Sequence, residues 1–202
     1  MKVLISIGVS IIITFTSFGQ NVQDFVKLKE LDKSFAYDMR YATDNNFLKE
    51  AVYDCADCVI RKIVADSLMK ANEYFKSKGY TIQFFDCYRP LDVQKKMWKV
   101  LPNSTYVANP QYGSIHNRGG AVDITLIDVE GNSLNMGTEF DHFGEEAHHA
   151  YQDLPDEVLA NRKLLKEGMI KFGFNPIRSE WWHYNFGPSK QYEVSNFPVK
   201  CD

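Results

Sequence analysis

The sequence of 202 residues lacks any long run of basic side chains, and its formal net charge is −3. Nucleic acids and anionic membranes are bound through clustered lysine and arginine, so the composition argues against both classes of partner. The sequence also lacks an internal repeat, a low-complexity tract and a linker that would divide it. Its 45% hydrophobic and 24% charged residues are typical of one globular domain with a core of its own.

The N-terminal apolar stretch at residues 3–15 is shorter than the roughly 20 residues that a spanning helix needs. It follows the positive start Met1-Lys2 and precedes Ser17-Phe18-Gly19, which has a small-x-small pattern. These features predict a secretory signal peptide at residues 1–19, followed by one domain at residues 20–202. We therefore expect a periplasmic or secreted protein with no stable membrane insertion after signal cleavage. An uncleaved anchor or a buried strand is the alternative.

Cysteines are few: the chain has only Cys55, Cys58, Cys87 and Cys201. The Cys-x-x-Cys spacing of the first two also occurs in redox motifs and zinc knuckles. The second half of a knuckle is missing, however, and no thioredoxin-like pattern precedes the pair. An even number of cysteines in an exported protein favours two disulfides, for which three pairings exist. We expect the segment 55–58 to be linked to Cys87 and to Cys201, with the exact pairing left open.

The spacing of apolar residues predicts a mixture of helices and strands. Helical periodicity and end signals indicate helices at residues 60–78, 90–101 and 155–172. Residues that favour extended structure indicate strands at residues 35–41, 80–87, 121–127 and 181–186. Because helices and strands do not alternate strictly, this order favours an α+β fold over a doubly wound parallel sheet.

One carboxylate lies where the sequence predicts burial. Asp123 falls in the middle of the mostly apolar strand predicted at residues 121–127. Burying a carboxylate costs several kcal/mol unless a cation or hydrogen-bond donors meet it. His116 precedes the pair Gly119-Gly120, which allows the chain to fold back toward this strand. The pattern indicates either a metal site or a buried hydrogen-bonded pair.

A second unusual segment is Glu180-Trp181-Trp182-His183. The two tryptophan rings can exclude water and raise the pKa of the glutamate toward the range useful to a general base. Strand alternation places Glu180 and His183 on opposite faces, so a shared site requires a bend or bulge at Glu180. A surface glutamate beside core tryptophans is the alternative.

Two histidines and one aspartate are a common ligand set for zinc, and this set leaves the fourth position to water. We therefore expect one Zn²⁺ per chain at His116, Asp123 and His183. Glu180 would then accept the proton of the water, and Arg89 would stabilise the developing oxyanion. Arg89 could also form a structural pair with Asp86.

Zinc D,D-peptidases related to the hedgehog fold carry paired motifs that resemble two segments of this chain, Ser114-x-His116-x-x-Gly119-x-Ala121-x-Asp123 and Glu180-x-Trp182-His183. More narrowly, the chain resembles the D-alanyl-D-alanine dipeptidases of the vancomycin-resistance type. Further similar segments lie at residues 41–47, 86–90 and 136–141. The resemblance therefore extends over nearly all of the predicted domain.

The resemblance implies a central antiparallel sheet flanked by helices and a zinc enzyme that hydrolyses the small dipeptide D-alanyl-D-alanine. It implies the same zinc ligands, with Glu180 as general base and acid and Arg89 as oxyanion stabiliser. It also suggests that Tyr41 and Asp141 hold the amino group of the substrate. Tyr53 and Ser114 would lie near its other polar groups, although Asp141 could instead cap a turn.

The same resemblance predicts a small closed pocket that binds both charged ends of a dipeptide and thereby excludes longer chains. One departure is Cys87, which stands where glycine is familiar in the family. The expected role is peptidoglycan turnover or nutrient recovery. The alternatives are a D,D- or L,D-carboxypeptidase that trims wall stem peptides, a non-catalytic zinc-binding module and a cysteine-based redox protein.

Overall fold

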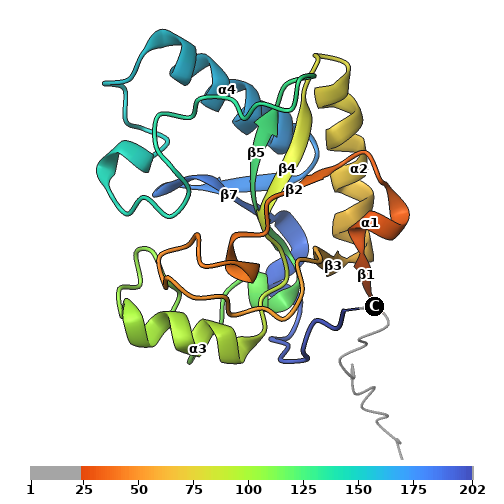
Figure 1. Cartoon of the computed structure of the whole chain (residues 1–202), viewed down its shortest axis with the longest axis vertical. Helices are drawn as coiled ribbons and strands as arrows, with labels where there is room; N and C mark the ends of the chain where they lie inside the picture. The colour runs from red at the N-terminus through yellow and green to blue at the C-terminus, as the bar shows by residue number, and fades with distance from the viewer. Residues whose placement is uncertain (1–23, 202) are drawn as a thin grey trace, which may run out of the picture.

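The computed structural model of the protein describes residues 24–201, so the predicted signal peptide lies outside the described residues (Figure 1). The central sheet has five strands in the order β2 (Ala36–Tyr37), β4 (Thr81–Asp86), β5 (Ala121–Ile127), β7 (Glu180–Phe186) and β6 (Phe174–Ile177). Strands β2 and β4 are parallel, and all other neighbours in this sheet are antiparallel. A smaller sheet pairs β1 (Phe25–Lys27) with β3 (Val59–Arg61).

Helices flank the sheet, as expected for the α+β class. They are α1 (Leu28–Leu31), α2 (Lys62–Lys76), α3 (Leu91–Val100) and α4 (Asp156–Lys171). In Figure 1, α4 lies at the top of the view and α3 at the bottom, with the sheet between them. Short 3-10 turns are η2 (Arg40–Ala42), η3 (His116–Arg118), η4 (Glu145–Ala147) and η5 (Gly187–Gln191).

Helix α2 illustrates how the apolar pattern builds the core. Val64, Leu68 and Phe75 recur at helical spacing, and all three are fully buried. Burial of each such side chain contributes roughly 1.5–3 kcal/mol. Helix α4 approaches Phe75 closely at Gly168, where an added Cβ would lie 2.3 Å from the ring. Only glycine therefore permits this distance between the two helices.

Several elements differ from the sequence-based expectation. The predicted strand at residues 35–41 is limited to β2, because the chain turns at η2 and buries Tyr41 to 2% exposure. The helix predicted from residue 60 begins at Lys62, because Val59–Arg61 pairs with β1 as a strand. Strand β6 was not expected, and it forms the edge of the sheet beside β7.

All four cysteines are paired, in the disulfides Cys55–Cys201 and Cys58–Cys87. The expected links from the segment 55–58 to the other two cysteines are confirmed, and the structure selects one pairing. The second disulfide joins the residue before β3 to the residue after β4, next to the candidate site. Between residues 24 and 201, no helix has the length and apolar character required to cross a membrane.

Candidate functional site

Two pairing features of the sheet align polar side chains across its central strands. The β4–β5 register shifts between Phe84 and Asp86, which places Asp86 opposite Asp123. On the other side of β5, Asp123 pairs with His183 of β7. One residue from each of three neighbouring strands thus lies in a row, and the bulge after Phe84 is what brings Asp86 into that row.

His116 reaches this row from η3. Gly119 ends that turn with φ 66°, a conformation that glycine adopts without strain, and the chain then enters β5. The Nδ1 atom of His116 lies 2.6 Å from the carbonyl oxygen of Cys87. Because a carbonyl only accepts hydrogen bonds, Nδ1 carries the proton and donates, and Nε2 presents its lone pair to the row.

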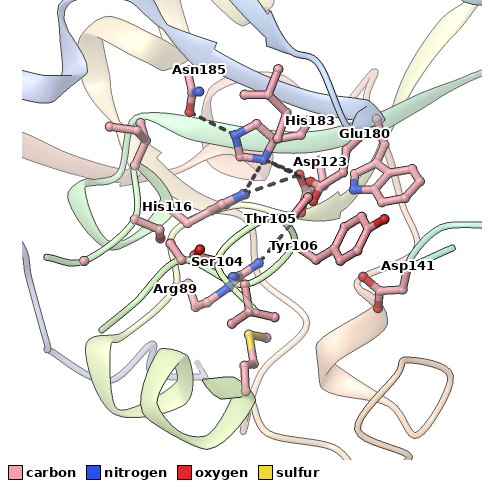
Figure 2. A pocket seen from close by; sticks show the side chains of 18 of the residues that line it. Arg89, Ser104, Thr105, Tyr106, His116, Asp123, Asp141, Glu180, His183 and Asn185 are labelled. Atoms are coloured by element: carbon pink, nitrogen blue, oxygen red, sulfur yellow. Dashed lines mark hydrogen bonds and ion pairs between the residues drawn. The ribbon is translucent and has the colours of Figure 1, made fainter. Parts of the chain in front are cut away.

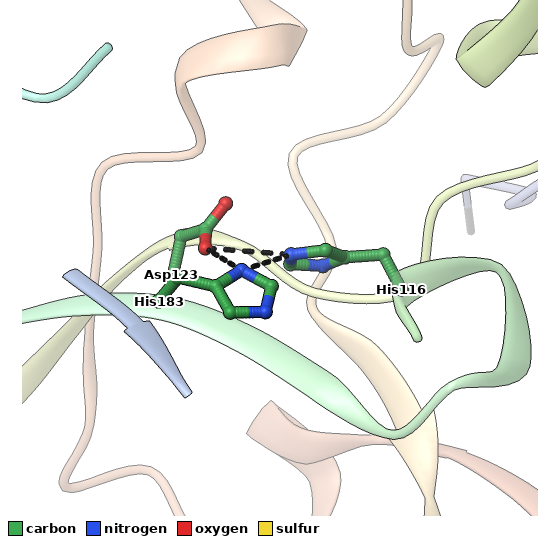
Figure 3. Close-up of side chains that lie close together, drawn as sticks. All are labelled: His116, Asp123 and His183. Carbon is green, nitrogen blue, oxygen red and sulfur yellow. Dashed lines mark hydrogen bonds and ion pairs between the residues drawn. The ribbon is translucent and has the colours of Figure 1, made fainter. Parts of the chain in front are cut away.

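Three ligand atoms converge in the interior (Figure 3). The Nδ1 atom of His183 lies 2.9 Å from Oδ1 of Asp123 and 3.1 Å from Nε2 of His116. His116 Nε2 lies 3.3 Å from the same carboxylate oxygen. On its far side, His183 donates from Nε2 to Oδ1 of Asn185 at 2.9 Å, so its Nδ1 also presents a lone pair.

The three converging atoms are all hydrogen-bond acceptors, so the cluster is unstable when no proton or cation lies among them. Burial opposes ionisation of Asp123, but the positive charge and the hydrogen bonds that the adjacent imidazoles supply when they carry an added proton hold the pKa of this carboxyl well below its usual range. Two lone pairs and a carboxylate at these distances repel one another unless a proton or a metal cation lies between them. The donor set, two imidazoles and one carboxylate, is one that zinc accepts with a position left open, so the residues present fit a zinc ion.

Glu180 lies beside these three residues because of a second irregularity. The β6–β7 register shifts, so that Pro176 pairs with Tyr184 while Ile177 pairs with Glu180. The bend that the sequence required is therefore present, and Oε2 of Glu180 lies 4.0 Å from Nδ1 of His183. Burial raises the pKa of Glu180 to about 8, since the carboxylate has lost its hydration.

Arg89 is held on several sides by its neighbours. Its Nε and one terminal nitrogen donate to the same oxygen of Asp86 at 3.0 and 2.6 Å, and its other terminal nitrogen donates to Gln94 at 3.0 Å. Burial alone would lower the pKa of Arg89, but the Asp86 carboxylate outweighs it and the pKa is raised. The guanidinium lies 3.8 Å from Oδ2 of Asp123. Arg89 therefore forms the structural pair with Asp86 that was the alternative interpretation, and it also lies close to Asp123, one of the predicted metal ligands.

Asp141 and Tyr41 form a second polar pair in the same cavity. The Tyr41 hydroxyl donates to the Asp141 carboxylate, with distances of 3.0 and 3.2 Å to its two oxygens, and the backbone N–H of Phe47 donates at 3.4 Å. Burial, reinforced by the negative charge of Asp123, raises the pKa of Asp141 to about 7. Asp141 also has φ 62°, which aspartate adopts more readily than most residues.

One cavity of about 480 Å³ is lined by the polar side chains described above other than Asp86 and Gln94, namely Tyr41, Arg89, His116, Asp123, Asp141, Glu180, His183 and Asn185. Figure 2 shows Arg89, Glu180 and Asp141 around the space that the three converging residues also face. Ser114, which the resemblance suggests lies near the substrate, also lines this cavity. Tyr53 is not among its lining residues; the Tyr53 hydroxyl donates to Asp86 at 2.8 Å, behind Arg89.

Several lining or supporting residues were missed by the sequence-based analysis. Asn185 could have been found, because it lies two residues after His183 and alternation places both on one face of β7. Gln94, Tyr106 and Phe143 gave no signal, since their roles depend on how separate loops and a helix meet. Among residues 24–201, no histidine other than His116 and His183 lies in a cluster of side chains that could hold a metal ion.

Replacement of Asp141 by asparagine is expected to stabilise the metal-free protein at alkaline pH. The raised pKa means that the folded state holds the Asp141 proton more tightly than the unfolded state. Stability is therefore lost as the pH rises from about 4 to about 7, by at most about 4 kcal/mol. Asparagine is neutral and accepts the positive φ, so it avoids this loss.

The measurement is urea unfolding of both proteins with chelator present, at pH 5 and pH 8. The variant should exceed the native protein in free energy of unfolding at pH 8, with a smaller difference at pH 5. The same difference at both pH values would show that the Asp141 carboxyl titrates normally.

Several known proteins match most of this chain. A model of the family described as D-ala-D-ala dipeptidase matches residues 21–200, a range that includes every site residue above. A D-alanyl-D-alanine dipeptidase of Escherichia coli (strain K12) is 33% identical over 178 residues, which cover 88% of this chain and 92% of that protein. One from Enterococcus faecium is 31% identical over 199 residues, with 87% and 98% covered. The solved structure of VanYB in complex with D-alanine-D-alanine has a TM-score of 0.46 and 17% identity, over 68% of this chain and 77% of that one.

Proposed function

Since the chain belongs to the family of D-Ala-D-Ala dipeptidases, we propose that it hydrolyses D-alanyl-D-alanine to D-alanine with one zinc ion, outside the cytoplasm. The observation that carries this proposal is the convergence of His116, Asp123 and His183 beside Glu180 and Arg89. A ligand set with an open position, an adjacent acid of raised pKa and a cation are the groups used in metal-assisted hydrolysis of an amide. A non-catalytic zinc module would have no need for the last two.

A bound zinc ion would supply Lewis-acid chemistry by lowering the pKa of a water molecule. The side chains of the chain account for the remaining tasks. Glu180, with its carboxylate 4.0 Å from His183, accepts the proton of the attacking water and passes it to the leaving amine. Arg89 keeps N–H groups that Asp86 and Gln94 do not occupy, and these stabilise the negative charge that develops on the carbonyl oxygen.

The remaining polar groups position the substrate. The Asp141 carboxylate receives the ammonium group of the dipeptide, and Tyr41 holds that carboxylate in place through its hydroxyl. Ser114 is assigned to the polar groups at the other end, because its side chain lines the cavity. Tyr53 contacts Asp86, so we propose that it acts as a positioning residue for Arg89 through that carboxylate.

The location outside the cytoplasm is supported by the two disulfides, which persist in oxidising compartments and are rare in the cytosol. We infer that the free dipeptide in such a compartment would be a wall-derived fragment. A role in peptidoglycan turnover or nutrient recovery follows from that chemistry. A redox role is disfavoured because the cysteines of the Cys-x-x-Cys pair are bonded to distant partners and not to each other.

The proposed function is tested by comparing D-alanyl-D-alanine with an N-blocked tripeptide that ends in the same two residues. We expect the purified protein to hydrolyse the free dipeptide with the higher kcat/KM, because Asp141 has a cation to bind only in that substrate. Preference for the blocked substrate would instead identify a carboxypeptidase that trims stem peptides. Turnover of neither substrate by zinc-loaded protein would favour the non-catalytic module.

A further inference from the structure

We propose that three aromatic rings, those of Phe47, Tyr106 and Phe143, restrict the substrate to free dipeptides by covering the end of the cavity at which the amino group binds. We call these three residues the aromatic cap. The inference rests on the proposed function and deepens it, because it assigns the limit on substrate length to named side chains.

The aromatic cap is assembled from three segments that are distant in sequence. The Phe143 ring lies 5.2 Å from the Phe47 ring in an edge-on arrangement and 4.9 Å from the Tyr106 ring in a tilted one. All three rings line the same cavity, and each side chain is half-buried. The three rings thus form one contiguous aromatic section of the cavity wall.

The cap lies directly against Asp141. The backbone N–H of Phe47 donates to the Asp141 carboxylate at 3.4 Å, and Phe143 follows Asp141 by two residues. The Phe47 ring also contacts Tyr41, the other partner of that carboxylate, at 6.3 Å between centroids. Tyr106 faces the same cavity as Asp141 and Glu180 (Figure 2). An amino group bound at Asp141 is therefore next to the rings.

An acyl group on that nitrogen would meet two obstacles. The amide nitrogen carries no charge, so it offers the buried Asp141 carboxylate no ion pair. The added atoms would also have to extend from Asp141 toward the place where Phe47 and Phe143 are in contact. The first obstacle weakens binding, whereas the second excludes the substrate by steric clash, which is a common source of specificity. Removal of a ring relieves only the second.

The test is Phe143→Ala, measured as the ratio of kcat/KM for N-acetyl-D-alanyl-D-alanine to that for D-alanyl-D-alanine. We expect the ratio to rise at least about tenfold relative to the native protein, equivalent to ~1.4 kcal/mol of discrimination. Where turnover of the blocked substrate is too slow to follow, its binding can be measured as an inhibition constant against hydrolysis of the free dipeptide. This inhibition constant should be lower in the variant than in the native protein.

A matched control is Phe197→Ala. Phe197 also belongs to a cluster of three aromatic rings, at 4.4 Å from Tyr88 and 4.9 Å from Phe25, but it does not line the cavity. Loss of one ring there removes a similar packing contact and should leave the ratio unchanged. Tyr106→Ala provides a second variant of the cap if Phe143→Ala does not fold.

The outcomes separate the two proposals. A native protein that prefers the free dipeptide, with an unchanged ratio and inhibition constant in the folded cap variants, would overturn the aromatic cap and leave the proposed function intact. An equal rise in the control would also overturn the cap, because it would trace the effect to general loosening. A native protein that already prefers the blocked dipeptide would refute the proposed function itself.

Discussion

Replacement of Glu180 by glutamine is expected to reduce kcat for D-alanyl-D-alanine by a factor on the order of 10³, while zinc remains bound. Glutamine has nearly the same shape, so the packing around Trp182 is retained. It cannot accept the proton of the attacking water or donate it to the leaving amine, and both transfers are assigned to this one carboxylate. Zinc should stay because the converging ligand atoms belong to His116, Asp123 and His183.

The measurement combines steady-state kinetics with the zinc content of the same preparation. Glu146→Gln is a suitable control, because Glu146 is an exposed carboxylate that is paired with His142 at 3.0 Å and lies outside the cavity. The control should retain kcat. Full activity in Glu180→Gln would refute the assigned mechanism, and loss of zinc from that variant would mean that Glu180 is a ligand and not a base.

Replacement of Arg89 by alanine is expected to lower kcat by about 10²–10³, because it removes the donor that meets the developing oxyanion. The change also leaves Asp86 buried without its cation, which is costly to the fold. The double variant Asp86→Asn with Arg89→Ala removes both charges and is the version to use if the single variant unfolds.

Added guanidinium separates the two roles of Arg89. If the side chain stabilises charge in the transition state, the free cation should restore part of kcat in the alanine variant, with zinc content unchanged throughout. Undiminished kcat would contradict the assignment. A loss of activity that always accompanies loss of zinc, without rescue, would reduce Arg89 to a structural partner of Asp86.

The elements predicted best were those in which local pattern and tertiary environment agree. Strand β5 begins and ends where the apolar run does, since the strand is central and covered on both faces. Helix α2 follows its buried stripe, although it starts two residues later and ends two residues earlier than predicted. The start differs because the backbone of Val59–Arg61 forms its hydrogen bonds with β1 as a strand. This pairing is a long-range contact, which local propensity does not predict.

The convergence of His116, Asp123 and His183 was predictable in part because burial makes an isolated aspartate conspicuous. Alternation correctly required a bend between Glu180 and His183, yet the register of β6 that produces it depends on an edge strand without a clear signal. The partner of Arg89 was named only as an alternative, although Asp86 is three residues away. Their contact depends on the bulge after Phe84, which is a property of two paired strands.

The aromatic cap was beyond the reach of sequence patterns. Phe47, Tyr106 and Phe143 lie in three loops, where spacing carries no periodic information. They meet because the elements that carry the loops are fixed by the sheet. The disulfide pairing was open for a similar reason: the spacing of the four cysteines permits three pairings, and only the position of the C-terminal segment against residue 55 selects one.

The central claim is most directly tested by metal analysis of the zinc-loaded protein and of a His116→Ala variant, each assayed for D-alanyl-D-alanine hydrolysis before and after treatment with a chelator. We predict one zinc per native chain, simultaneous loss of zinc and turnover on chelation, recovery of both on addition of zinc, and neither in the variant. Undiminished hydrolysis by metal-free protein, or a full complement of zinc in the variant, would contradict the site that His116, Asp123 and His183 are proposed to form.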